Sequence, residues 1–170
     1  MSEELQNKDS HDEFLTFSRI TKQNWLCPDR NHFPFGSSKE EWVEVFLETR
    51  LEASVPREII QLFEIARGSM IYGWFFYPLV TQGLEQCTRI AEFAARSRCL
   101  MLSQKPGNFF ENIETLAAAG VISTADAPRW QSMRGLRNSR SHLKSLMLVD
   151  PGQAAGYLRT TAELINKLFP

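Results

Sequence analysis

Three side chains near residue 140 have the chemistry of a reactive site: Arg137, Asn138 and His142. An imidazole can act as an acid or as a base at neutral pH, because its pKa lies near neutrality. A guanidinium carries a permanent charge, and its forked donors fit phosphate oxygens. Asn138 precedes His142 by four residues, so on a helix its amide would lie on nearly the same face. These residue types favour acid–base chemistry at a phosphate group.

The segment around these residues is the most basic part of the chain. Between residues 127 and 149 it contains no acidic residue and five basic ones: Arg129, Arg134, Arg137, Arg140 and Lys144. The formal net charge of the chain is −1, so any attraction for a polyanion must come from such a local concentration of charge. We expect Arg134, Arg140 and Lys144 to bind RNA without taking part in the chemistry, and the alternative for Arg134 and Arg140 is a solvated face.

The spacing within the group has a geometric consequence. On a straight helix, residues five apart, such as Arg137 and His142, are separated by roughly 140° around the axis. The two side chains can meet if the helix bends, or if two copies of the chain meet across a symmetric interface. A single straight helix does not bring them together.

The pattern Arg137-Asn138-x-x-x-His142 resembles the signature of HEPN domains, in which an arginine and a polar residue are followed by a histidine. The upstream run from Ala66 to Leu79, leading to Gly83-Leu84-Glu85, looks like the helical pair that precedes this motif in many bacterial HEPN proteins. The segment Ala119-Gly120-Val121-Ile122 also fits. The resemblance covers about residues 58 to 145.

The resemblance implies an all-α domain that dimerises through the motif helix and pools two motifs in one cleft. It implies a metal-independent endoribonuclease without a cofactor, with Arg137, Asn138 and His142 as catalytic residues and Glu85 as a supporting acidic residue. A toxin or antiviral defence effector is the implied setting, with an antitoxin or a nucleotidyltransferase as a partner. The alternative is a non-catalytic HEPN domain that binds nucleotide, RNA or a partner protein.

RNA supplies the nucleophile for such a reaction. Its 2′-hydroxyl can attack the adjacent phosphorus when a base removes the proton and when the charge on the phosphoryl oxygens is stabilised. In this scheme His142 transfers the proton, Arg137 stabilises the charge, and cleavage leaves a 2′,3′-cyclic phosphate. The scheme requires no metal ion.

The elements that must position these residues are predicted to be helices. A capping box of Ser38 and Glu41 opens a first helix, roughly 39–52. Pro56 opens a second, and Pro78 kinks or interrupts the apolar run before a third helix continues to about Leu102. The small residues of this run, which would let another helix approach closely, are Gly68, Ser69 and Gly73.

Three more helices follow. Asn108 caps a fourth, which Gly120 ends. A second capping box from Ser123 to Asp126 opens the fifth helix, which carries the motif and continues through Leu143 and Met147. The pair Asp150-Pro151 opens the sixth.

The predicted fold class is therefore all-α, an up-and-down bundle of five or six helices. We expect residues 37–170 to form this single domain and residues 1–36 to form an irregular arm. A chain of 170 residues is long enough for one full core and too short for two domains of ordinary size.

Several other functional classes find no support in the sequence. The most apolar stretch, residues 70–80, is about half the length of a membrane-spanning helix. Three cysteines, an odd number without close spacing, and an acidic N-terminus indicate a reducing cytoplasm. Cys27 and His32 lack the further ligands of a zinc site, and there is no glycine-rich phosphate loop or nucleophile elbow.

Structural interpretations compete with the functional ones. His142 would also be favourable as a residue of a helix C-terminal turn, where it interacts with the dipole. Glu85 and Arg89 have the spacing of an ordinary ion pair on one helix. The aromatic residues 74–77 are predicted to form core or dimer surface rather than a platform for bases. A purely structural helical dimerisation module is a third hypothesis for the whole chain.

Overall fold

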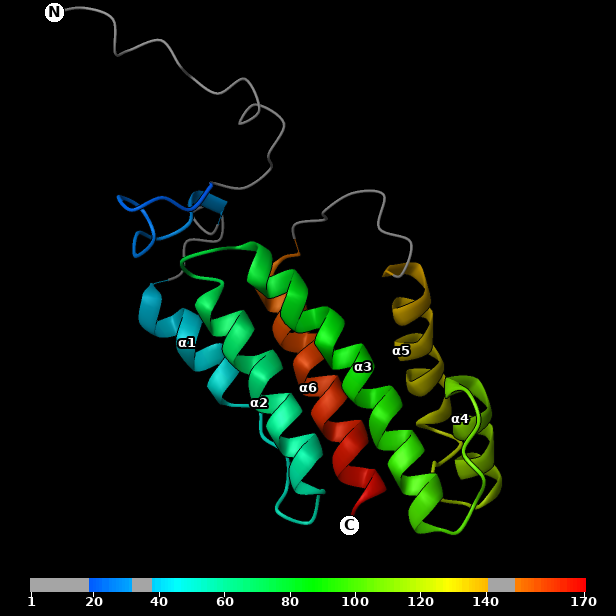
Figure 1. The fold of residues 1–170 in the computed structure, drawn as a ribbon. Helices are drawn as coiled ribbons and strands as arrows, with labels where there is room; N and C mark the ends of the chain where they lie inside the picture. Colours follow the sequence, from blue (N-terminus) through cyan, green and yellow to red (C-terminus); the bar gives the residue numbers. More distant parts are fainter. Residues whose placement is uncertain (1–18, 32–37, 141–148) are drawn as a thin grey trace, which may run out of the picture.

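The computed structural model describes residues 19–31, 38–140 and 149–170, with the side chains of Ser139 and Arg140 left aside (Figure 1). These residues contain helices and turns but no strand. The six helices are α1 (Lys39–Leu47), α2 (Arg57–Tyr72), α3 (Pro78–Met101), α4 (Phe109–Ala118), α5 (Ala127–Arg140) and α6 (Pro151–Leu168). The predicted all-α fold class is confirmed.

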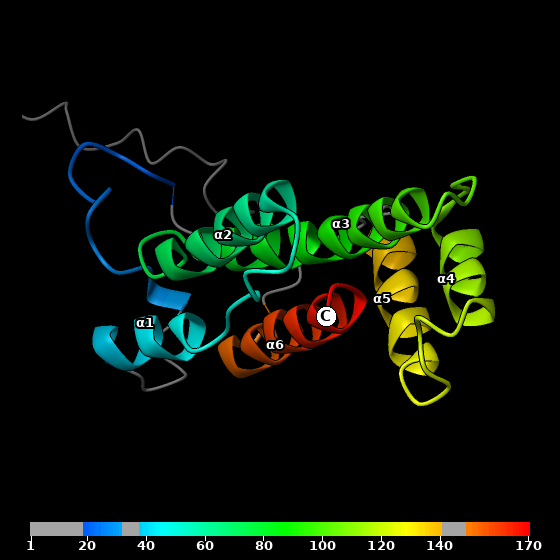
Figure 2. The same ribbon diagram turned by 90° about the horizontal axis from the view of Figure 1, so that it is seen from below.

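The long helix α3 lies at the centre of the bundle. It packs against α2, α4, α5 and α6, while α1 packs against α2 and α6. Figure 1 shows α1 and α2 on one side of the α3–α6 pair and α4 and α5 on the other, and Figure 2 also shows α1 at the opposite side of the bundle from α4 and α5. The helix that carries the motif is therefore supported by α3 and α4 and lies far from α1.

Three of the helices begin at the capping residues that the sequence predicted. Ser38 with Glu41 and Asn108 with Glu111 form complete capping boxes, in which side chains satisfy unpaired backbone amides. The Asp150 carboxylate accepts a hydrogen bond from the Gln153 amide at 3.0 Å. Because these hydrogen bonds join residues three apart, the local sequence is sufficient to predict where these three helices start.

The first helix is shorter than the predicted range of 39–52, since α1 ends at Leu47. The backbone that follows is bound by distant residues. The Thr49 carbonyl accepts a hydrogen bond from Arg67 on α2 at 3.1 Å, and the Glu52 amide donates to Asn166 on α6 at 2.9 Å. These tertiary hydrogen bonds replace those that another helical turn would have made.

Pro78 marks a complete break between α2 and α3. The first helix of the pair ends at Tyr72, and Pro78 takes the first turn of α3, where its missing amide hydrogen costs nothing. A Cβ atom on Gly73 would lie 2.4 Å from Val80 Cγ2, and one on Gly83 would lie 2.6 Å from Met70 Cγ. Close packing of α2 on α3 thus requires Gly73, as predicted, and Gly83. The prediction for Gly68 is wrong, because its Cβ would meet open space.

Aromatic side chains join the elements around this break. The Trp42 ring packs edge-on against Phe46 and Trp74, with ring centroids 5.7 and 5.8 Å apart, and it also contacts Tyr77. Its indole Nε1 donates to the Ile71 carbonyl at 3.0 Å. Trp74 and Tyr77 are buried, which confirms their assignment to the core.

The described part of the N-terminal arm, residues 19–31, contains no α-helix and is anchored to the same break. The buried Asp29 carboxylate accepts a hydrogen bond from the Tyr77 amide at 2.9 Å, and the Asp29 amide donates to the Trp74 carbonyl at 2.8 Å. The arm therefore packs on its own domain, one of the two possibilities left open by the sequence.

Among the helices of the described residues, none combines the length and the apolar character needed to cross a membrane. The apolar stretch 70–80 is divided between the end of α2, the turn and the start of α3.

Candidate active site

The first half of α5 is held firmly by buried contacts. Trp130 and Met133 are almost completely buried, and the Trp130 ring packs edge-on against Phe109 of α4 with centroids 6.3 Å apart. Since the rest of the helix continues from this fixed base, the direction of α5 is set by its packing against α3 and α4.

Charged contacts fasten the start of α5 to α6. Lys167 Nζ lies 2.8 Å from both oxygens of the buried Asp126 carboxylate, and Arg129 forms an ion pair with Glu163. The hydrogen bond from Lys167, assisted by one from Ser123, lowers the pKa of Asp126. The hydrogen bond to Glu163 raises the pKa of Arg129.

The predicted capping box at this start is half formed. The Asp126 amide donates to Ser123 Oγ at 3.1 Å, but the carboxylate accepts from the Ser123 hydroxyl instead of its backbone amide. Lys167 explains the difference, because it draws the carboxylate toward α6.

The last turns of α5 present Arg137 and Asn138 on the surface. Arg137 Nε donates to Glu92 Oε2 on α3 at 3.2 Å. The two side chains are 44% and 30% exposed, and pairs with this degree of exposure contribute about 0.2–1 kcal/mol. A phosphate group could therefore replace Glu92 as the partner of Arg137 at little energetic cost.

Glu85 lies on the same face of α3 as Glu92. Seven residues separate them, which corresponds to two helical turns and about 10 Å. Glu85 Oε1 is one of two buried side-chain atoms that lack a hydrogen-bond partner among the described residues. Glu85 and Arg89 are spaced for an ion pair, but within the described part of the chain they do not form one. Glu85 thus keeps an unused acceptor on the face of α3 that also meets Arg137.

The basic residues of α5 point to different neighbours. Arg134 lies over the Phe110 ring of α4, with its guanidinium carbon 5.2 Å from the centroid, and its Nε donates to Gln131 at 2.8 Å. Arg129 faces α6 and Arg137 faces α3. The structure therefore pairs Arg137 with Glu92 of α3, whereas Arg134 packs on Phe110 of α4.

The other residues predicted for the site follow α5 or lie at its end. His142 and Lys144 lie outside the described residues, and the same holds for the side chain of Arg140. Glu92 is the residue that sequence reasoning missed. Its seven-residue spacing from Glu85 on a predicted helix was the available signal.

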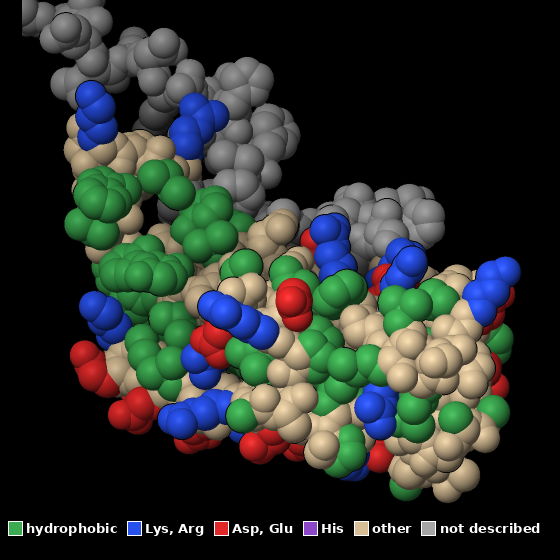
Figure 3. Space-filling view, turned by 60° about the horizontal axis from the view of Figure 1, so that its bottom comes forward, with side chains coloured by type: hydrophobic (Ala, Val, Ile, Leu, Met, Phe, Trp, Pro, Cys, Tyr) green, Lys and Arg blue, Asp and Glu red, His purple; other side chains and the backbone are tan. Residues whose placement is uncertain are grey.

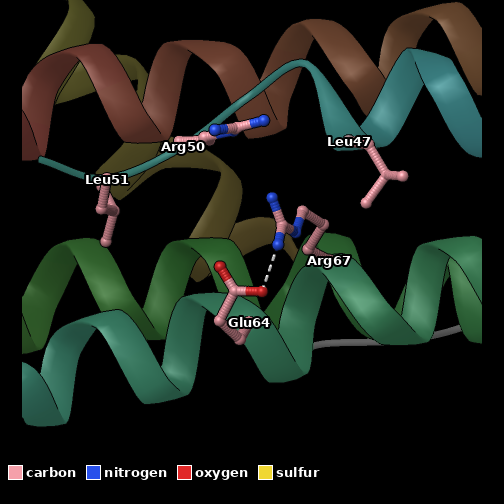
Figure 4. A pocket seen from close by; sticks show the side chains of 5 residues that line it. All are labelled: Leu47, Arg50, Leu51, Glu64 and Arg67. Carbon is pink, nitrogen blue, oxygen red and sulfur yellow. Dashed lines mark hydrogen bonds and ion pairs between the residues drawn. The ribbon is translucent and has the colours of Figure 1, made fainter.

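A cavity of about 340 Å³ lies on the other side of the bundle, lined by Leu47, Arg50, Leu51, Glu64 and Arg67 (Figure 4). Arg67 uses one guanidinium nitrogen to bind the Thr49 carbonyl and the other to pair with Glu64. These contacts hold the segment after α1 against α2. The cavity contains none of the predicted site residues, so we assign it a structural role.

Other chemistry is not favoured by the described residues. No group of three or more His, Cys, Asp or Glu side chains within them is arranged to hold a metal ion. Burial raises the pKa of the Cys87 thiol to about 12 and also raises the pKa of Cys99. Neither buried thiol is therefore suited to act as a nucleophile at neutral pH.

Comparison with known proteins adds no further constraint. No protein-family model matches the chain, and no curated protein or solved structure is significantly similar to it.

Proposed function

We propose that this protein is a metal-independent endoribonuclease that cleaves RNA by attack of the 2′-hydroxyl on the adjacent phosphorus. Arg137, Asn138 and His142 are the proposed catalytic residues, and Glu85 is the proposed supporting residue. The proposal also includes the resemblance to HEPN domains and a symmetric dimer in which two motifs face each other. A toxin or defence effector, with an antitoxin or nucleotidyltransferase partner, is the proposed setting.

One observation supports this proposal most strongly. Arg137 and Asn138 are exposed on the last turns of a helix whose first half is anchored by the buried side chains of Trp130 and Met133. A catalytic group must be held within a fraction of an ångström of its working position while it remains accessible to substrate. The first half of α5 provides the fixed position, and the last turns provide the accessibility.

The role of Glu92 follows from its contact with Arg137. In the absence of RNA, the carboxylate holds the guanidinium beside α3 at 3.2 Å. When a phosphate approaches, the guanidinium exchanges one anionic partner for another and then stabilises the charge that develops on the phosphoryl oxygens. The exposed pair keeps Arg137 oriented without binding it tightly.

Proton transfer is assigned to His142, and Asn138 is proposed to orient its imidazole or to bind the ribose. An imidazole is suited to remove the 2′-hydroxyl proton or to protonate the leaving 5′-oxygen at neutral pH. The separation of Arg137 and His142 on a straight helix favours a site that combines residues from two chains.

The test is cleavage of single-stranded RNA by the purified chain in excess EDTA. We expect the wild type to generate products that end in a 2′,3′-cyclic phosphate. His142→Ala and Arg137→Ala should each abolish cleavage, whereas Arg159→Ala should not. Arg159 is a matched control because it is an exposed arginine of α6 with a long contact of 4.0 Å to Glu48. Cleavage at the wild-type rate by either motif variant would refute the assignment.

The contact between Arg137 and Glu92 also supports a second candidate, a non-catalytic domain that binds nucleotide, RNA or a protein. An arginine held in an ion pair can serve as a structural or binding residue. This candidate predicts binding without cleavage across a panel of single-stranded and hairpin RNAs, and loss of that binding in Arg137→Ala.

A further inference from the structure

Residues 19–31 form a compact turn that is braced by one asparagine. The Asn24 side chain accepts a hydrogen bond from the Thr21 amide at 2.7 Å and donates to the Arg19 carbonyl at 2.9 Å. Backbone hydrogen bonds from Trp25 to Thr21 and from Cys27 to Asn24 close the turn. Together with the buried Asp29, this network fixes the arm on the break between α2 and α3.

This braced turn presents large apolar side chains to solvent. Trp25 and Leu26 are each 59% exposed, and Ile20 is 55% exposed. Figure 3 shows hydrophobic side chains gathered on the arm, with Lys and Arg side chains at its outer edge. An ordered turn that holds an indole more than half exposed presents it for contact, and such aromatic patches commonly mark contact surfaces.

The charge of residues 19–31, the described part of the arm, differs from that of the chain as a whole. Arg19, Lys22 and Arg30 are exposed, and Asp29 is the one acidic residue between positions 19 and 31. Its carboxylate is buried, where it accepts backbone hydrogen bonds. The chain carries a net charge of −1, so this basic surface belongs to a slightly acidic protein. Charge complementarity therefore favours an anionic partner.

The arm lies at the same end of the bundle as the last turns of α5. Figure 1 shows both at the end where α3 and α6 begin. Lys39, the first residue of α1, extends the basic surface, and its Nζ lies 5.6 Å from the centroid of the Phe75 ring. Residues 19–31 and Arg137 thus lie at the same end of the bundle.

We propose that residues 19–31 are a contact surface for single-stranded RNA, in which Trp25 stacks on a base and Lys22 and Arg30 bind phosphates. Aromatic stacking with flanking cations is the common chemistry of single-strand recognition, and it tolerates any base because every base has a π-face. This inference rests on the proposed function, because the proposed substrate identifies the anionic partner as RNA. It gives the arm the role of holding RNA outside the site of cleavage.

The experiment measures the affinity of the full-length chain for a fluorescent single-stranded RNA, with His142→Ala in every variant to prevent cleavage. Trp25→Ala should weaken binding about tenfold, and Trp25→Phe should retain most of the affinity, since phenylalanine can still stack. Met101→Ala, which removes a side chain of similar exposure at the far end of α3, should bind like its parent.

The two cations are tested by salt dependence. Lys22→Ala with Arg30→Ala should reduce the slope of log K against log salt by about 1.4, because each phosphate contact in a single strand contributes about 0.7. Thermal unfolding of each variant should match the parent, since the side chains of Trp25, Met101, Lys22 and Arg30 are all exposed.

The outcomes separate this inference from the proposed function. RNA binding that depends on Trp25 in a wild-type chain that does not cleave refutes the proposed function and leaves the arm surface standing. Cleavage by a wild type whose RNA affinity is unchanged by Trp25→Ala refutes the arm surface alone. The arm surface is equally refuted if Trp25→Ala leaves RNA affinity unchanged but releases the chain from anionic lipid vesicles.

Discussion

The two halves of α5 are held by different kinds of contact. The first half is fastened by the buried rings of Trp130 and Phe109 and by the contact of Lys167 with a buried carboxylate. The last turns carry exposed polar side chains, and the pair of Arg137 with Glu92 is open to solvent. The difference shows how one helix can provide stability at one end and an accessible, oriented guanidinium at the other.

The largest expected effect comes from removing the buried base of the helix. Trp130→Ala should lower the free energy of unfolding by about 3–5 kcal/mol, because it removes a large buried ring and leaves a cavity. Urea denaturation measures the change. If the loss is below 1 kcal/mol, the first half of α5 is not the fixed base described above.

A smaller effect is expected at the polar anchor between α5 and α6. Asp126→Asn should lower the free energy of unfolding by about 1–2 kcal/mol, since it weakens a charge-assisted hydrogen bond to a lysine that is itself half exposed. Urea denaturation at pH 7 gives the value.

The pH dependence of this anchor has a definite sign. The pKa of Asp126 is lowered in the folded chain, so its contribution is fully present above the ordinary aspartate pKa of about 4. The contribution is lost as the pH falls through the lower pKa of the folded state. The difference between wild type and Asp126→Asn should therefore shrink below pH 4, and a difference that grows there would contradict the assignment.

The matched acid-to-amide change in Glu92 of α3, the partner of Arg137, should have the smallest effect on stability. Glu92→Gln should change the free energy of unfolding by less than about 0.5 kcal/mol, because the pair is exposed. It should tighten RNA binding, since a carboxylate no longer competes with phosphate for Arg137. A loss of stability as large as that of Asp126→Asn would show that both halves of α5 are structural.

Features that depend on near neighbours could be predicted from the sequence. The caps at Ser38, Asn108 and Asp150 involve residues three apart, and the break at Pro78 follows from the chemistry of proline. The motif residues are also close together in sequence, and the structure places Arg137 and Asn138 on the fifth helix, as predicted.

Features that depend on distant neighbours could not be predicted in this way. The backbone after the end of α1 at Leu47 accepts a hydrogen bond from Arg67 and donates one to Asn166, and periodicity does not reveal these partners. Likewise, the basic residues of α5 lie within one segment that lacks acidic residues, yet Arg129 contacts α6 and Arg134 contacts α4. The pairing of Arg137 with Glu92 joins residues 45 positions apart.

The most direct test of the proposed active site mixes two inactive variants. We expect wild type to cleave RNA in EDTA, and Arg137→Ala and His142→Ala to be inactive when assayed alone. After the two variants are unfolded together and refolded, heterodimers contain one intact Arg137 and one intact His142 on different chains. Recovery of cleavage, to roughly a quarter of the wild-type rate if half of the dimers are mixed and each retains one of two sites, is the predicted result. A wild type that leaves RNA intact, or a refolded mixture as inactive as its components, would contradict a site built from two copies of the motif.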